Sequence, residues 1–447
     1  MHRPMNAASP PGAISRRGLL QGGAALLGGL ALGSLTGCAS GAAGGSRQNL
    51  SYWHLLSGPD GEKMGALVDG FNQSQNEALI TQTVLAWGSP YYTKLAMASA
   101  GGRAPDVAIM HAARIPGYAP GGLLDTWDRG LFDELGLREG DFPERIWAKN
   151  LFAGELTAVA LDSHPFVLYY NTEIADRAGA LGSNGQLVDV STPEEFKDLA
   201  ARLGDASDGG HGLAFGYLGD GSNMWRMFYT YYCQMGGTIE LPVGGKMVYD
   251  EGLAIDTLEW ILSLIDGKLG NASHDGGTAI SEFATGKAGM FFGGVWETGS
   301  YKAQGVPFDM KVVPNVFGTP VAYADSHSFV LPHQSNPDPD RRRIVHEFVA
   351  SILKGSLAWA EAGHIPAYNP VVDDPAYADL IPQSHYAEAR DYLVYDPEAW
   401  FSGSGSDFHR YFGDHVQNVF MRTVTPKDGL DGFVKRINAL LAKPSPV

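Results

Sequence analysis

The first part of the chain shows two hydrophobic periods, and each predicts one kind of element. Residues 50–56 and 79–87 have the apolar runs and alternation of strands, whereas residues 64–71 between them repeat apolar side chains every three or four positions, as a helix does. A helical pattern over 90–100 and a short apolar run over 105–110 follow. This order of strand, helix, strand, helix and strand is typical of a parallel α/β sheet.

The rest of the chain predicts further strands and helices. Apolar runs predict a strand over 157–170. They also predict a helix over 280–289 that leads into a strand over 290–292. Thr192 precedes a proline and two glutamates, which is the pattern of a capped helix start. Helical periodicity marks 339–353, and we expect the tail 381–441 to be mostly helical.

The N-terminus has the parts of an export signal. The pair Arg16–Arg17 resembles a twin-arginine signal, and an uncharged stretch rich in Gly, Ala and Leu follows over 18–37. Leu-Thr-Gly-Cys, ending at Cys38, resembles a bacterial lipobox, in which the cysteine is acylated and becomes the new N-terminus. The stretch is also long enough for a transmembrane helix, but its many glycines disfavour one. We expect residues 1–37 to be removed and residues 38–48 to form a lipid-anchored tether.

Charge and cysteine content restrict the function further. Removing residues 1–37, which hold three arginines and no acidic residue, leaves 410 residues with 29 basic and 49 acidic side chains, a net charge of −20. This length is enough for two or more domains, and the charge argues against nucleic acid or an anionic membrane as the ligand. With Cys38 assigned to the lipid, Cys233 has no disulfide partner and is expected to be a small buried hydrophobe. We expect a monomer that meets the membrane only through its lipid.

A series of short motifs between Tyr52 and Pro370 is informative through its order. The motifs are Phe-Asn at 71–72, Tyr-Tyr-Thr-Lys-Leu at 91–95, Ala-Pro-Asp-Val at 104–107, Leu-Leu-Asp at 123–125, Tyr-Tyr-Asn at 169–171, Phe-Ala-Thr-Gly-Lys-Ala-Gly-Met at 283–290, Gly-Val-Trp-Glu at 294–297 and Ser-His-Ser-Phe at 326–329. This order, behind a lipobox, resembles the extracellular solute-binding proteins (family 1, maltose-binding-protein-like) of carbohydrate ABC importers.

The resemblance implies a fold and a function. The fold is α/β, of the two-lobed periplasmic-binding-protein type (type II), with the ligand in a cleft between lobes that close about hinge crossings. The N-terminal lobe would hold 49–161 and 327–365, and the C-terminal lobe 162–326 and 366–447. The function implied is a receptor, not an enzyme, that needs no cofactor or metal. It would capture a sugar, such as a di- or oligosaccharide, at the outer face of the cytoplasmic membrane and deliver it to ABC permease subunits.

A neutral sugar is bound by rings that pack on its C–H faces and by polar groups that hydrogen-bond its hydroxyls. The resemblance implies a stacking role for Trp296, and the two glycines before it leave space for a ligand. Glu297 either accepts bonds from hydroxyls or caps the next helix, and Asp162 is either a ligand contact or a structural bond of the hinge. The predicted ligand contacts are Ser57, Asp60, Trp87, His111, Asp162, His164, Trp225, Trp296, Glu297 and His364.

Several of these positions also suit a structural role. Ser57 and His111 follow strands at their carboxyl ends, where ligands of α/β sheets bind, but the turn at Ser57 also suits an ordinary loop. Trp87 is as compatible with the core as with stacking. Trp225 stands at an expected helix start that faces either the cleft or the core, and a lone histidine such as His364 is often a structural one.

Three other functions remain open at this point. Asp106, Asp162 and Glu297 offer the acid pair of a glycoside hydrolase, although nothing in the sequence sets their separation. A metal receptor would use several of the histidines at motif ends, namely His54, His111, His164, His327 and His364. A glycerol phosphate compound as the ligand would need Arg or Lys in the cleft. Stacked tryptophans in the cleft would indicate a sugar, converging guanidiniums a phosphate, and three imidazoles around one point a metal.

Overall fold

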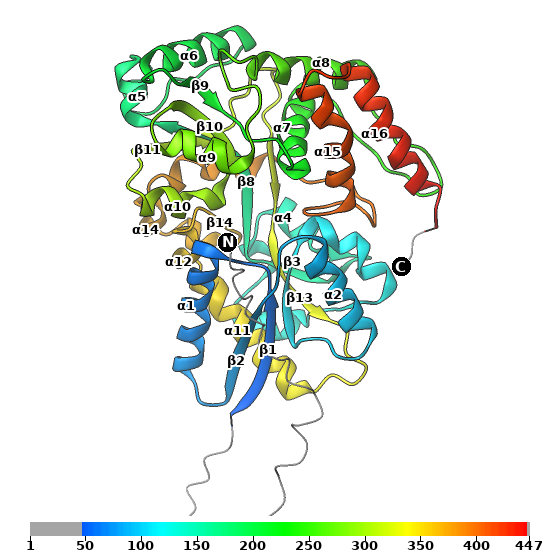
Figure 1. Cartoon of the computed structure of the whole chain (residues 1–447). Helices are drawn as coiled ribbons and strands as arrows, with labels where there is room; N and C mark the ends of the chain where they lie inside the picture. Colours follow the sequence, from blue (N-terminus) through cyan, green and yellow to red (C-terminus); the bar gives the residue numbers. More distant parts are fainter. Residues whose placement is uncertain (1–46, 445–447) are drawn as a thin grey trace, which may run out of the picture. The chain divides into compact units, whose positions relative to one another are not determined.

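The computed structural model describes residues 47–444, which form two main β-sheets covered by helices (Figure 1). The predicted export signal over 1–37 and the predicted lipidation site Cys38 lie outside the described residues. Within residues 47–444, no helix is both long enough and apolar enough to cross a bilayer.

The first sheet confirms the predicted alternation of strands and helices. In spatial order its strands are β2 (Ala78–Val84), β1 (Gln48–His54), β3 (Val107–His111), β13 (His327–Pro332) and β4 (Leu124–Asp125), with β7 (Ala158–Ala160) beside β13. β1 is parallel to β2 and β3, and the helices α1 (Gly58–Ser74) and α2 (Ser89–Ala100) make the crossover connections that parallel strands require. β13 comes from far along the chain and is antiparallel to β3.

The second sheet is built around one long buried strand, β8 (Asp162–Asn171), all ten residues of which are buried. In spatial order the sheet holds β15 (Leu393–Val394), β12 (Ala322–Asp325), β8, β10 (Ala288–Gly294) and β9 (His211–Ala214), with β11 (Phe308–Val312) and β14 (Ile365–Pro366) also paired with β8. Because β8 is covered on both faces, its sequence is apolar throughout its middle and does not alternate.

Helices cover both sheets. Those nearest the second sheet are α5 (Thr172–Arg177), α6 (Pro193–Ala206), α7 (Gly221–Gln234), α8 (Glu251–Leu264), α9 (Gly276–Ala284), α10 (Thr298–Ala303), α15 (Asp407–Phe420) and α16 (Pro426–Leu441). The others are α3 (Arg129–Glu134), α4 (Glu144–Lys149), α11 (Pro339–Lys354), α12 (Leu357–Ala360), α13 (Asn369–Val372) and α14 (Pro375–Ala378). α6 begins where predicted, since the Thr192 hydroxyl accepts a hydrogen bond from the Glu195 amide at 3.2 Å. α15 and α16 confirm that the tail is largely helical.

The segments that pass between the two sheets lie side by side. The chain leaves the first sheet after β7 and enters the second at β8, and it returns from β12 to β13. The Leu161 amide donates to the His327 carbonyl at 2.7 Å, and the Ala367 amide donates to the Leu161 carbonyl at 3.0 Å. Three segments far apart in the sequence are therefore hydrogen-bonded to one another at the junction of the sheets.

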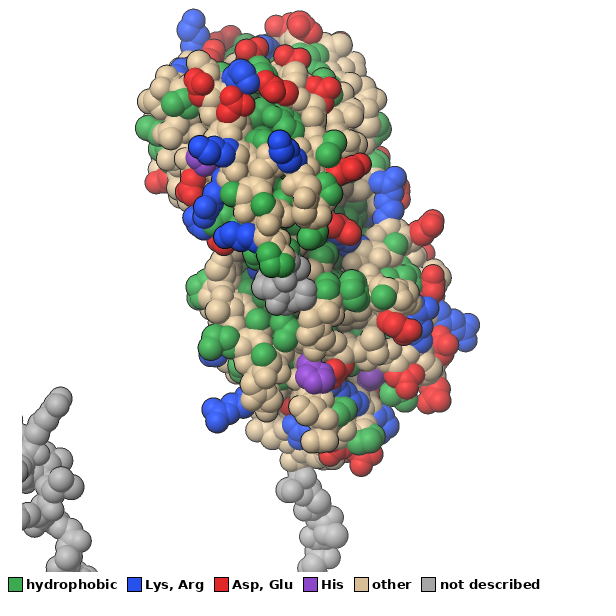
Figure 2. All heavy atoms as spheres, turned by 90° about the vertical axis from the view of Figure 1, so that its right-hand side faces the viewer, with side chains coloured by type: hydrophobic (Ala, Val, Ile, Leu, Met, Phe, Trp, Pro, Cys, Tyr) green, Lys and Arg blue, Asp and Glu red, His purple; other side chains and the backbone are tan. Residues whose placement is uncertain are grey.

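The acidic side chains are dispersed over the face of the molecule drawn in Figure 2. There Asp and Glu are spread over both halves and interspersed with Lys and Arg. The net charge of −17 over the whole sequence is therefore not gathered into one acidic patch on this face. A surface of mixed sign suits a protein that stays soluble and does not associate with polyanions.

Gly363 gives the first testable prediction, because its place between α12 and β14 requires glycine. Its φ is +113°, and a Cβ there would lie 2.1 Å from the Val295 carbonyl oxygen. We expect Gly363→Ala to lower the free energy of unfolding by roughly 2 to 4 kcal/mol, measured by denaturant unfolding. The matched control is Gly65→Ala in α1, where a Cβ meets nothing within 4 Å and should be neutral or stabilising by up to about 1 kcal/mol. Equal unfolding midpoints for the two variants would contradict this account of the junction.

Candidate functional site

One cavity of about 640 Å³ lies where elements of the two sheets meet, and we call it the cleft. The residues that line it are Leu55, Leu56, Ser57, Gly58, Pro59, Asp60, Trp87, His111, His164, Gly219, Asp220, Ser222, Arg226, Trp296, Glu297, Ser300 and His327. Several follow the carboxyl ends of parallel strands, the usual location of ligands in α/β sheets. The predicted contacts Ser57, Asp60, Trp87, His111, His164, Trp296 and Glu297 are all among them.

Trp296 presents its ring to the cleft from the short 3-10 turn that follows β10. The ring lies back over Gly294, where a Cβ would come within 2.0 Å of it, so glycine is required at that position. The Arg226 guanidinium lies 4.8 Å from the ring centroid, within the range of a cation–π contact. The His164 ring is edge-on at 6.1 Å. Trp296 is therefore held from two sides and is partly open to a ligand.

Glu297 has an unusual protonation state. Burial, reinforced by the nearby Asp60 carboxylate, raises the pKa of Glu297 from 4.5 to about 7. Near neutral pH its carboxyl is therefore divided between the acid, which donates a hydrogen bond, and the carboxylate, which accepts. Asp60 lies in the first turn of α1 and also lines the cleft.

Asp162 does not line the cleft but lies fully buried next to it. Its carboxylate accepts from the His327 amide at 2.8 Å, from the Nδ1 atoms of His164 and His327 at 3.0 and 2.9 Å, and from the Trp359 indole at 2.7 Å. Burial alone would raise the pKa of Asp162, but the surrounding histidines outweigh it and hold the pKa well below the usual range. The Asp162 carboxylate is thus engaged in hydrogen bonds at the junction of the two sheets.

His364 is a fully buried cation that joins two carboxylates. Its Nε2 lies 3.2 Å from Asp60 Oδ1 and its Nδ1 lies 3.1 Å from Asp162 Oδ2. Burial opposes protonation, yet the two carboxylates together raise the pKa of His364 to about 10. His364 does not line the cleft; it acts on it by holding Asp60 in place.

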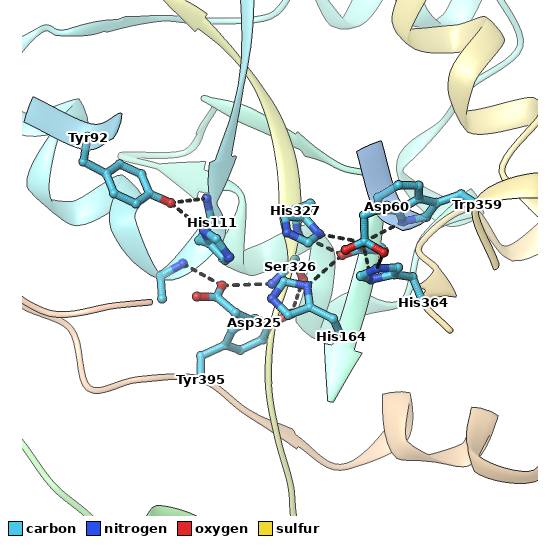
Figure 3. Close-up of polar contacts among 12 residues, drawn as sticks. Asp60, Tyr92, His111, His164, Asp325, Ser326, His327, Trp359, His364 and Tyr395 are labelled. Atoms are coloured by element: carbon cyan, nitrogen blue, oxygen red, sulfur yellow. Dashed lines mark hydrogen bonds and ion pairs between the residues drawn. The ribbon is translucent and has the colours of Figure 1, made fainter. Parts of the chain in front are cut away.

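The three histidines of the cleft have their Nδ1 atoms engaged elsewhere. His164 and His327 bond to Asp162 through Nδ1, and His111 Nδ1 pairs with the Tyr92 hydroxyl. Because Asp162 is ionised and can only accept, His164 and His327 both carry a proton on Nδ1. Burial lowers the pKa of His164 to about 3 and that of His111 well below its usual value, so these two imidazoles are neutral and the Nε2 of His164 is unprotonated. The cleft therefore meets three imidazoles whose orientation is fixed from behind (Figure 3).

The spacing of part of this cluster also matches a metal site. One ligand atom from each of Asp162, His164, His327 and His364 lies within 4.8 Å of the others. However, a protonated His364 has no lone pair to offer, and the Nδ1 protons of His164 and His327 already point at the Asp162 carboxylate. The donor set fits a hydrogen-bonded network better than a coordination shell.

Trp225 is a correction to the predicted site. It is fully buried in the hydrophobic core around the second sheet. Its indole donates to Asp396 at 2.6 Å, and its ring stacks on Tyr229 with centroids 4.8 Å apart. The side chains of α7 that do reach the cleft are Ser222 and Arg226, which the sequence analysis did not select. They stand four residues apart and so share one face of the helix, and that spacing after the expected helix start was the available signal.

The acid pair that the sequence offered for glycoside hydrolysis, from Asp106, Asp162 and Glu297, is not assembled in the cleft. Asp106 lies just before β3, at the opposite end of that strand from the cleft, and binds Arg341 at 2.8 Å. Asp162 is occupied by its four donors. Of the acids proposed for an enzyme, only Glu297 lines the cleft.

Comparisons with known proteins agree with this geometry. The family model described as bacterial extracellular solute-binding protein matches residues 57–353. No curated protein matches the chain in sequence. Among solved structures, similarity is found to the GacH receptor of Streptomyces glaucescens, described unliganded and with acarbose. It is 20% identical with a TM-score of 0.72, and the match covers 88% of this chain and 98% of that one.

Two further structures have the same fold at low identity. Maltose-bound MalE3 of T. maritima is 17% identical with a TM-score of 0.72, over 88% of this chain and 99% of that one. UgpB of Mycobacterium tuberculosis in complex with glycerophosphocholine is 17% identical with a TM-score of 0.72. The match covers 88% of this chain and 98% of that one. At such identities the similarity establishes the two-lobed α/β periplasmic-binding-protein fold.

The raised pKa of Glu297 predicts a pH-dependent stability. Between about pH 4.5 and 7 the folded protein retains a proton that the unfolded chain has released, so the free energy of unfolding falls as pH rises through this window. At about pH 8 we expect the free energy of unfolding of Glu297→Gln, measured by denaturant unfolding, to exceed that of the wild type by roughly 1 to 2 kcal/mol. The difference should vanish below about pH 4.5. The exposed Glu139→Gln is the control. A Glu297→Gln effect that does not change with pH would contradict the assignment.

Proposed function

The chain belongs to the bacterial extracellular solute-binding protein family, and from that premise we propose that it is the sugar receptor of an ABC importer. Family membership makes it a binding protein rather than an enzyme. The proposal of a sugar rests on one observation above all, the partly open ring of Trp296 in a cleft whose other lining groups are hydrogen-bonding side chains. A volume of about 640 Å³ lies within the range of about 300 to 1,000 Å³ that is usual for small-molecule sites.

The polar groups of the cleft match the needs of hydroxyls. His164 presents an unprotonated Nε2 atom that accepts from a hydroxyl group, His327 lines the cleft beside it, and Glu297 either donates or accepts. Because Asp162 fixes both imidazoles from behind, little rotational freedom is lost when they bind a ligand, which favours affinity. A sugar with its C–H face on Trp296 and its hydroxyls toward the histidines would use all of these groups.

Binding is proposed to work through closure of two lobes. The first lobe would hold residues 49–161 and 327–365, the second 162–326 and 366–447. The cleft takes Asp60 and His111 from the first lobe and Trp296 from the second, so a solute that contacts both sides stabilises the closed form over the open one. This population shift would give the permease a surface that it recognises only when cargo is present. The lipid on Cys38 would keep the receptor at the membrane, next to the permease.

The stacking role of Trp296 is testable with the purified protein. A thermal-shift screen against mono-, di- and oligosaccharides should find a stabilising sugar, because a ligand at 100 times its Kd adds about 2.7 kcal/mol. We expect Trp296→Ala to weaken binding of that sugar at least tenfold, about 1.4 kcal/mol, without unfolding the protein. Trp296→Phe should lose less, because a ring remains.

The matched control is Trp53→Ala on β1, since Trp53 lies outside the cleft beside Lys94. Its affinity for the sugar should equal that of the wild type. Normal affinity in Trp296→Ala would show that the ring does not stack on the ligand.

A further inference from the structure

Arg226 is a buried charge without a counter-charge in the part of the chain that the structure describes. It is only 8 % exposed, and its side chain lines the cleft from the second turn of α7. Among residues 47–444, its guanidinium forms no ion pair and donates no hydrogen bond; its close neighbour is the face of the Trp296 ring at 4.8 Å. Other well-buried arginines of the chain are paired, such as Arg342, which binds Asp125. Arg226 is thus unlike an arginine kept for stability.

A buried guanidinium without partners is costly, because its five N–H groups lose water and gain little in return. Stacking on Trp296 recovers part of this cost, but a ring face accepts no strong hydrogen bond. Such a group fits a site whose missing partner arrives from outside. The direction in which Arg226 faces, into the cleft, indicates that the partner is the ligand.

The surroundings of Arg226 add further donors. It lies on the same face of α7 as Ser222, near the N-terminus of this 14-residue helix, where the amides of Gly221 and Ser222 make no hydrogen bond within residues 47–444. Unpaired amides and the helix dipole favour an anion there. Asp220 also lies on this side, but its Oδ1 accepts from the Asn223 amide at 2.9 Å as the helix cap.

His111 faces the same part of the cleft. The Tyr92 hydroxyl accepts from the His111 amide at 3.2 Å and is therefore free to donate its own proton to His111 Nδ1. The His111 proton then stands on Nε2, so this histidine presents a donor where His164 presents an acceptor. After burial and the two neighbouring histidines, the positive charge of Arg226 also lowers the pKa of His111, and both side chains line the cleft.

We propose that the solute carries an oxyanion, a carboxylate or a phosphate ester, which Arg226 binds with help from His111 and the start of α7. This inference rests on the proposed receptor function and narrows its substrate class from neutral sugars to acidic sugars or polyols. Asp60 and Glu297, which also line the cleft, would repel a second negative group, so the rest of the solute is neutral and rich in hydroxyls. Arg226 then binds the anionic group, and Glu297 binds hydroxyls.

Matched pairs of solutes test the proposal by isothermal titration. Glucose is compared with glucuronate and glucose 6-phosphate, glycerol with glycerol 3-phosphate, and maltose with digalacturonate. We expect the anionic member of at least one pair to bind at least tenfold more tightly than the neutral one, and its affinity to fall as ionic strength rises. Carboxylate and phosphate pairs that respond differently identify which oxyanion is the natural one. Arg226→Gln should weaken that binding at least tenfold, and Arg226→Lys less so.

A second measurement separates a binding role from a structural one. Because Arg226 has no partner in the unliganded protein, Arg226→Gln should melt at or above the wild-type temperature while it loses the ligand. The control is Arg410→Gln on α15, since Arg410 is 54% exposed and pairs only with Asp407 and Asp414 on the surface. It should bind every solute as the wild type does.

Three outcomes contradict the proposal in distinguishable ways. Neutral sugars that bind as tightly as their acidic partners, unaffected by Arg226→Gln, would overturn the oxyanion but leave the receptor function intact. A fall of several degrees in the Tm of unliganded Arg226→Gln would assign the arginine to stability. Silence across every pair, neutral and acidic, would contradict the receptor function as well as this inference.

Discussion

The buried carboxylate of Asp162 is the interaction on which the arrangement of the two sheets depends. Asp162 is the first residue of β8, yet its hydrogen bonds reach His327 at the start of β13 and Trp359 in α12, and His364 next to β14 lies in contact. An ionised group away from water is tolerated only when it is paired and fully hydrogen-bonded. That requirement binds all three passages between the sheets to a single point. Removing the carboxylate would leave the His364 cation buried beside Asp60 alone.

The same interaction fixes the chemistry of the cleft. By accepting the Nδ1 protons of His164 and His327, Asp162 decides which nitrogen of each ring faces the ligand, and by pairing with His364 it helps to hold Asp60. The cleft then holds charges of both signs: within residues 47–444 Arg226 on α7 has no counter-charge, whereas Asp60 and Glu297 raise the cost of any further negative group. Because these groups are held rigidly and favour opposite charges, they can determine the orientation in which an unsymmetrical solute binds.

Sequence reasoning succeeded where structure is local. The strands and helices of the first sheet follow from periods of two and of 3.6 residues, and the helix start at Thr192 follows from one side-chain hydrogen bond. Several cleft residues, such as His111 and Trp296, stand directly after strands, so the order of motifs was enough to place them. The signal at Cys38 lies outside the described residues and remains a prediction.

Sequence reasoning failed where an element is buried on all sides, because its hydrophobic periodicity is then lost. Every residue of β8 is buried, so alternation could not show that Asp162 lies one layer behind the cleft that His164 reaches. α7 is buried from Met224 to Gln234, so its apolar face could not be distinguished from its cleft face, and Trp225 was selected instead of its neighbour Arg226. The absence of a partner for Arg226 depends on the positions of distant acids, which no local pattern records.

Small-angle X-ray scattering, with and without a solute that stabilises the protein, tests the central claim most directly. The account predicts a smaller radius of gyration when the solute is bound, because contacts on both sides of the cleft draw the two lobes together around the Asp162 junction. Scattering profiles that coincide at saturating solute would contradict closure, and with it the view that the cleft transmits the presence of cargo.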